Sequence, residues 1–286
     1  MILAHAGEPL QPHDVWTAWQ LDPVVVLGLA VLLWLHRRGR RPDDHRRDRA
    51  FVAAVIVVAA ALVSPLEALS GSLASAHMVQ HVLLIAVAAP LFAWSAPGPA
   101  LLRGMPAAVR RAPGRLRRRL GIRPSSWHLP TSAAGVWLLH VVVLWTWHSA
   151  ALYELAVEQP LLHVTEHVLF LGTAVLLWRV AIGRRTAVAS YGASVLLVFA
   201  TGMQAVLLSL LLTFANEAWY DVYADTTAAW GLTPLADQQL AGAIMWIPSG
   251  AIHVGIALAL VAAWLRTADD APARPPGRAP LIGGGP

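Results

Sequence analysis

The sequence contains no cysteine, no lysine and few charged residues of any kind. The absence of cysteine excludes disulfides, thiolate metal sites and cysteine nucleophiles. Charged residues make up only 13% of the 286 residues, whereas 57% are hydrophobic. A soluble domain of this size carries about a quarter charged residues. Because the excess apolar surface must face lipid, the composition predicts an integral membrane protein.

Residues 1–21 contain neither a basic n-region nor a continuous apolar core, which argues against a cleavable signal peptide. They predict a polar extracytoplasmic leader, in which Trp16 and Trp19 mark the membrane interface. At the other end, residues 267–286 are rich in proline, glycine and alanine and predict a disordered cytoplasmic tail. The transmembrane domain is expected between them, over residues 22–266.

Seven apolar runs predict membrane-spanning helices. They lie at residues 22–36, 50–64, 77–96, 132–150, 160–181, 190–214 and 239–265. A span needs about 20 residues, and the first two runs are short by that rule. The runs are too long and too unalternating for barrel strands. We therefore expect an all-α fold, a polytopic membrane bundle of seven transmembrane helices.

All 21 cationic side chains are arginines, and they lie in or beside alternate connections and the tail. The other three loops carry only acids, such as Glu67, Glu154 and Asp221. By the positive-inside rule, this alternation places the N-terminus outside and the C-terminus in the cytoplasm. The arginine runs therefore indicate a lipid bilayer, and not nucleic acid, as the partner. Six prolines in residues 97–130 argue against a long regular helix there.

Histidines gather at the outer ends of three predicted spans, where ionisable side chains are costly and usually functional. The five are His77, His81, His148, His163 and His167. The first two and the last two are each four residues apart, so each pair shares a helix face and can bind one ion. Imidazole suits copper, zinc, iron and nickel. We predict a metal site in this layer; the alternative is hydrogen bonding of neutral histidines between helices.

Three neighbouring residues are candidates for the same site. The thioether of Met78 would favour cuprous ion. Glu166 is a candidate ligand or a partner that orients an imidazole ring, unless it is an interfacial acid pointing to water. Asp237 opens the seventh span, where it either caps a helix or borders the metal layer.

A deeper group of polar and thioether side chains predicts either a relay or ordinary packing. His140 lies eight residues before His148, about 12 Å deeper along the same helix face. Met203 and Met245 lie at mid-depth in the last two spans, although methionine is commonly a gap-filler in cores.

A series of short motifs runs through the predicted spans. In chain order they are His77-Met78-Val79-Gln80-His81-Val82-Leu83-Leu84, Ala89-Pro90-Leu91, Pro97-Gly98-Pro99, Trp147-His148, Leu152-Tyr153, His163-Val164-Thr165-Glu166-His167, Phe170, Trp178, Asp237-Gln238-Gln239-Leu240-Ala241-Gly242, Met245-Trp246 and Pro248. In their order and placement, over about residues 20–266, they resemble the multi-spanning CtaG-type cytochrome c oxidase assembly factors. That family is distinct from the single-span copper chaperone sometimes given the same name.

The resemblance implies a non-enzymatic chaperone in a bacterial plasma membrane, which helps to assemble a haem–copper cytochrome c oxidase by supplying or inserting copper. It implies oxidase subunits and a copper-donor protein as partners, and cuprous copper as the bound metal. The positions that match the family are the five outer histidines, with Glu166 and Asp237 beside them.

Other classes of protein remain open at this point. A histidine-rich di-iron oxidase or hydroxylase would use pairs of histidines four residues apart, but the sequence has no HxxHH cluster and few carboxylates at this depth. A bis-histidine haem protein would give a Soret band. A metal transporter needs polar residues at every depth of the membrane. The cytoplasmic halves of the predicted spans offer few polar residues beyond His253.

Overall fold

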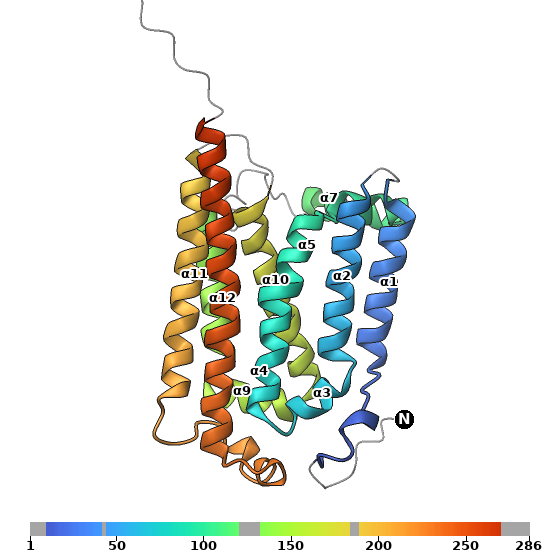
Figure 1. Ribbon diagram of the computed structural model, residues 1–286. Coiled ribbons are helices and arrows are strands. Elements are labelled where there is room, and N and C mark those ends of the chain that lie inside the picture. Colours follow the sequence, from blue (N-terminus) through green and yellow to red (C-terminus); the bar gives the residue numbers. More distant parts are fainter. Residues whose placement is uncertain (1–9, 42–43, 120–131, 184–188, 270–286) are drawn as a thin grey trace, which may run out of the picture.

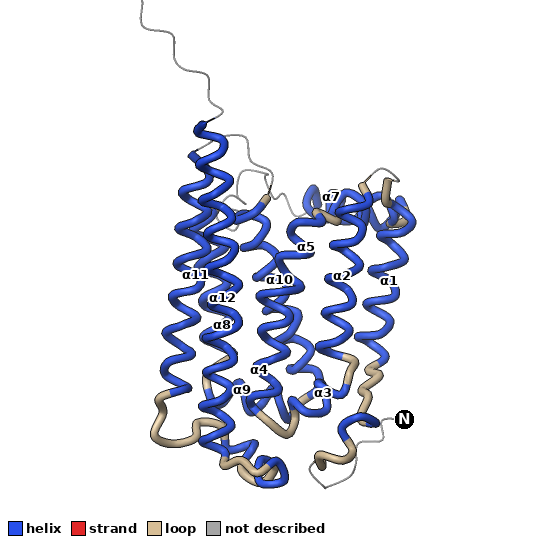
Figure 2. Tube along the Cα trace, in the orientation of Figure 1, coloured by secondary structure: helices blue, strands red, loops and turns tan. Residues whose placement is uncertain are grey.

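The structure is a computed structural model, which describes residues 10–41, 44–119, 132–183 and 189–269. Within these ranges all regular structure is helical, so the predicted all-α class is confirmed. Long helices run side by side, and short helices and loops occupy the two ends of the bundle (Figures 1 and 2). The α-helices are α1 Pro23–Gly39, α2 His45–Leu62, α3 Pro65–Ser70, α4 Ala74–Val82, α5 Ala89–Ser95, α6 Gly98–Gly104, α7 Ala107–Arg119, α8 Ala133–Trp147, α9 Ala150–Glu158, α10 Pro160–Ile182, α11 Ala189–Thr213 and α12 Pro234–Asp269.

Every predicted apolar run coincides with a helix, but the helices differ in their fitness to cross a membrane. Four segments of the described chain are long and apolar enough: Ala74–Ser95, Pro160–Ile182, Tyr191–Thr213 and Pro234–Thr267. A fifth arises if α8 and α9, which meet at 74°, form one bent span. The outer faces of these helices carry exposed leucine, valine and phenylalanine side chains, as expected against lipid.

Helices α1 and α2 are not long and apolar enough to be counted among these candidate spans. α1 has 17 residues and ends in Arg37 and Arg38. α2 has 18 residues, but its first turns contain three arginines and Asp48. Both helices nevertheless run alongside the longer ones (Figure 1).

The span that carries His77 and His81 is not a uniform α-helix. α4 and α5 are joined by a π-helical segment, η2, over Leu83–Ala88. Pro90 lies two residues after its end, and a proline removes a backbone donor and clashes with the carbonyl four residues earlier. The wider π turn relieves that clash. The indole Nε1 of Trp178 donates to the Ile85 carbonyl oxygen at 2.9 Å, which ties this segment to α10.

Charge is divided between the two ends of the bundle. The arginine-bearing ends of α1, α2, α10 and α12 lie at one end, where α7 runs crosswise (Figure 1). The acidic α3 and α9 lie at the opposite end, on the same side as the described part of the leader (Figure 1). Segment 97–130 forms the two short helices α6 and α7 in its described part, in agreement with its prolines.

The predicted boundary of the tail was slightly early, because α12 continues to Asp269. The remainder of the predicted disordered tail, residues 270–286, lies outside the described residues, as do residues 1–9 of the predicted leader.

Candidate metal centre

The acidic end of the bundle holds a cluster of buried histidines between α4 and α10. α10 begins with Pro160, which suits the first helical position because its missing N–H has no helical partner there. The helical repeat then places His163, Glu166 and His167 on one face. α4 presents His77 and His81 toward that face. Ring centroids of the two pairs lie 5.0 Å apart for His77 and His163 and 5.5 Å apart for His81 and His167.

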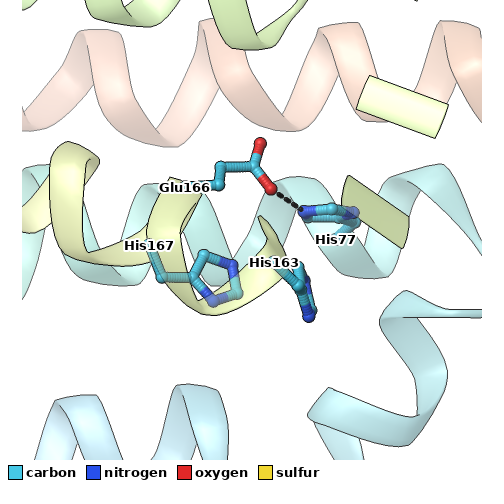
Figure 3. A group of neighbouring side chains, drawn as sticks. All are labelled: His77, His163, Glu166 and His167. Atoms are coloured by element: carbon cyan, nitrogen blue, oxygen red, sulfur yellow. Dashed lines mark ion pairs between the residues drawn. The ribbon is translucent and has the colours of Figure 1, made fainter. Parts of the chain in front are cut away.

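Four of these residues form a compact donor set: His77, His163, Glu166 and His167. One ligand atom from each lies within 4.8 Å of all the others. Figure 3 shows the four side chains close together, three from α10 and one from α4. Donors bound at about 2.0–2.1 Å to a tetrahedral ion lie about 3.3 Å apart. The furthest pair would therefore close in by about 1.5 Å around an ion.

The donor atoms of the cluster lack hydrogen-bond partners. The unpartnered buried atoms include Nε2 of all five outer histidines and both carboxylate oxygens of Glu166. Glu166 is fully buried, and its oxygens lie 3.5 Å from Nε2 of His77 and 3.4 Å from Nε2 of His81. Buried polar groups in folded proteins are normally satisfied, so a concentration of orphaned atoms points to a bound ion or water.

A hydroxyl network fixes the orientation of His77. The loop between α11 and α12 contributes Tyr223, whose hydroxyl donates to the Ser70 carbonyl oxygen at 2.9 Å. Its oxygen is therefore the acceptor for Nδ1–H of His77, at 3.3 Å, and for the hydroxyl of Tyr153, at 3.2 Å. Burial raises the pKa of Tyr223 well above its usual range, which keeps it protonated. Since Nδ1 carries the hydrogen, Nε2 of His77 has a free lone pair facing Glu166.

Glu67 orients the other side of the cluster. Helix α3 begins with the capping residue Ser64 and with Pro65, which bring Glu67 over the start of α10. One of its oxygens lies 3.2 Å from Nδ1 of His163, and the other accepts a hydrogen bond from Nε2 of Gln80. A carboxylate on Nδ1 leaves Nε2 of His163 as the free donor atom, an arrangement common among metal-binding histidines.

Asp237 supports the site from a distance, as the cap of α4. Its carboxylate accepts hydrogen bonds from the backbone N–H of Ala74, at 2.6 Å, and from both the N–H and the hydroxyl of Ser75. These are donors of the first turn of α4 that have no partner within the helix. α12 thus holds the helix that carries His77, and Asp237 itself lies outside the donor set.

Comparison with known proteins identifies the family. The profile of the cytochrome c oxidase caa3 assembly factor family, Caa3_CtaG, matches residues 27–267. The chain belongs to this family. No curated protein and no solved structure gives a significant match. The predicted resemblance is thereby confirmed, and membership of the caa3 assembly factor family favours a non-enzymatic role in the assembly of a cytochrome c oxidase.

In this member of the family, all five predicted outer histidines come together. The ring of His148 lies 5.5 Å from that of His81, at the edge of the cluster. Met78 is buried and lines a cavity beside the four-residue donor set. His140 and Met245 line the same cavity. Met203 does not, because its side chain lies half exposed on the outer surface of α11.

Sequence reasoning missed four residues that surround the caa3 assembly factor's cluster: Glu67, Gln80, Tyr153 and Tyr223. Gln80 lies three residues after His77, and this spacing was a usable signal because it places both on one helix face. In the sequence, Glu67 is only an acid that marks an outer loop. Tyr223 contacts the site across 146 residues of sequence, and no local pattern predicts such a contact.

Proposed function

We propose that this member of the caa3 assembly factor family carries copper as cargo, bound by His77, His163, Glu166 and His167, for insertion into a cytochrome c oxidase. The observation that supports this most strongly is the set of unpartnered lone pairs within one buried cluster. Three imidazole nitrogens and one carboxylate make a four-coordinate set of the kind that copper accepts.

Charge favours cuprous ion over a divalent metal. Glu166 is the only carboxylate that is fully buried within the donor set, while Glu67, at its rim, is 22% exposed. The charge of a monovalent cation cancels that of the Glu166 carboxylate. A neutral complex has the smallest free-energy cost of burial at membrane depth. The same cation also supplies a partner for Nε2 of His77 and the Glu166 carboxylate, which lie 3.5 Å apart.

The proposal places the chain in a bacterial plasma membrane as a seven-span protein with its N-terminus outside. The helices α1 and α2 complete the seven by running alongside the longer spans (Figure 1). The gathering of arginines at one end supports a cytoplasmic position for that end. The copper centre then faces outward, where it receives copper from a donor protein and releases it to an oxidase subunit.

The support residues suit reversible binding. Glu67 and Tyr223 hold Nδ1 of His163 and His77, so the donor nitrogens are oriented before the metal arrives. No described residue offers a thiolate, since the chain lacks cysteine, and a thiolate-free site releases cuprous ion more readily.

The test is oxidase maturation in a bacterial host whose oxidase depends on this chain. A His77→Ala, His167→Ala variant, present in membranes at the wild-type level, should yield oxidase subunits that lack copper and activity. His45→Ala is the matched control, because His45 is exposed at the start of α2. Full copper content and activity of the oxidase in cells with the double variant would overturn the proposal.

A further inference from the structure

A cavity of about 20 Å³ lies beside the metal centre and shares His81 with it. Six of the side chains around it carry nitrogen or sulfur donors: Met78, His81, His140, His148, Met245 and His253. They come from α4, from α8 and the residue that follows it, and from α12. The rest of the wall is mixed: Val82, Ile85, Leu144 and Ala205 are apolar, and Thr201, Gln204 and Ser249 are polar. A volume of this size holds one water molecule or one metal ion.

The hydrogen bonds of two cavity histidines define which ring nitrogen is free. Nδ1 of His148 lies 2.8 Å from the Leu144 carbonyl oxygen, and Nδ1 of His253 lies 2.8 Å from the Ser249 carbonyl oxygen. A carbonyl oxygen only accepts, so Nδ1 carries the hydrogen in both rings. Nε2 then carries the lone pair, and in both residues it is buried and has no partner.

His140 takes the same tautomer through a side-chain partner. Its Nδ1 lies 3.0 Å from the Thr173 hydroxyl oxygen, and that hydroxyl donates to the Leu169 carbonyl oxygen at 2.8 Å. The hydroxyl hydrogen is therefore used, and His140 must be the donor to Thr173. Three histidines from two helices thus have Nε2 as their metal-binding atom.

The donor chemistry of the cavity differs from that of the metal centre. Two thioethers and several neutral imidazoles line it, and no carboxylate does. Thioether sulfur selects cuprous ion. A divalent ion would also leave two uncompensated charges among these neutral side chains.

We propose that this cavity is a second binding site for cuprous ion, reached from the metal centre through His81. The inference rests on the proposed copper function of the outer cluster. His81 suits the connecting role because both of its ring nitrogens are unpartnered, its Nε2 lies 3.4 Å from Glu166, and its ring lies 5.5 Å from that of His148. Its side chain therefore contacts both donor sets.

Transfer between the two sites is a ligand exchange. Bonds from copper to the outer imidazoles and Glu166 break as bonds to His81 and then to the cavity nitrogens and sulfurs form. Copper stays cuprous throughout, and no electron or proton is transferred. His140 lies eight residues before His148 along α8, so the second site leads about 12 Å further into the bundle.

The test is a titration of the purified protein with cuprous ion under reducing conditions, with bound copper counted by mass spectrometry and its ligands examined by X-ray absorption. The wild type should bind two equivalents and show copper–sulfur scattering. A Met78→Leu, Met245→Leu variant should bind one equivalent without sulfur scattering. These substitutions conserve volume and leave the fold intact. Met203→Leu, which changes a half-exposed methionine away from the cavity, is the matched control and should bind two equivalents.

A second pair of substitutions separates this inference from the proposed function. His163→Ala, His167→Ala should lose the outer equivalent and keep one equivalent with copper–sulfur scattering. If the wild type binds one equivalent that this variant loses, and shows no sulfur scattering, the cavity holds no copper and the inference alone fails. If the wild type binds no copper, the proposed function fails with it.

Discussion

The substitution Glu166→Gln should change the stability of the protein in opposite directions with and without copper. In the copper-free protein both oxygens of Glu166 are buried without partners, and they face Nε2 of His77 and of His81. A glutamine of the same shape removes the buried charge and supplies an amide N–H₂ that can donate to one of these lone pairs. An unsatisfied buried polar group costs about 1–3 kcal/mol, and more when it is charged. The copper-free variant should therefore be more stable than the wild type by about 1–3 kcal/mol.

With copper bound, the wild type should be more stable than the Glu166→Gln variant. The amide is neutral and a weaker ligand, so the variant loses the charge compensation that we propose for the bound ion. Copper stabilises a protein that binds it by about 2.7 kcal/mol at a free concentration 100 times its Kd. The wild type should gain about this amount at a copper concentration at which the variant gains little.

The assay is thermal unfolding in mild detergent, followed by tryptophan fluorescence with and without cuprous ion. About 1 kcal/mol corresponds to a shift in Tm of about 2–4 °C for a domain of roughly this size. Glu158→Gln is the control, because it makes the same chemical change at an exposed position at the end of α9. A lower Tm for copper-free Glu166→Gln than for the wild type would refute the reasoning, since it would mean that the carboxylate is already satisfied.

Three further predictions follow from named contacts. Asp237→Asn removes the charge that caps α4 and should lower the free energy of unfolding by about 1–3 kcal/mol. Both Tm and copper affinity should therefore fall. The control Asp225→Asn, at an exposed position, should change neither. Tyr223→Phe orphans the Ser70 carbonyl oxygen and Nδ1 of His77, so copper affinity measured by chelator competition should fall about 10–100-fold; an unchanged affinity would mean that the tyrosine does not orient the ring. Gly39→Ala would place a methyl group against the backbone of Ala100 in α6 and should reduce folded yield, whereas Gly28→Ala, on the same helix with open space around it, should be tolerated.

The positions of the long helices follow from the sequence, because they depend on local apolar runs and on contact with lipid. Apolar length located a helix at each of the seven predicted runs, although only four segments of the described chain, or five with the bent pair, are long and apolar enough to cross a membrane. The same rule did not predict the π turn before Pro90, whose geometry depends on the partner that Trp178 provides from α10. Nor did it predict the break at Trp147, where α8 turns by 74° into α9.

The histidines of the centre could be predicted because they occur in pairs four residues apart, and this spacing directs both rings of a pair to one helix face. The supporting Tyr223 could not be predicted, because it acts across 146 residues through a loop whose position only tertiary packing determines. Asp237 was a candidate from its place at the start of the seventh run, but its partner in α4, 163 residues away, could not be predicted. Helix geometry alone turns Met78 about 100° away from His77, and the structure adds that it lines the cavity.

The most direct test of the copper centre is anomalous diffraction at the copper edge from crystals of the protein loaded with cuprous ion. We expect an anomalous peak within bonding distance of Nε2 of His77, His163 and His167 and of one oxygen of Glu166. An absent peak at that position in crystals that contain copper would show that these residues do not bind it.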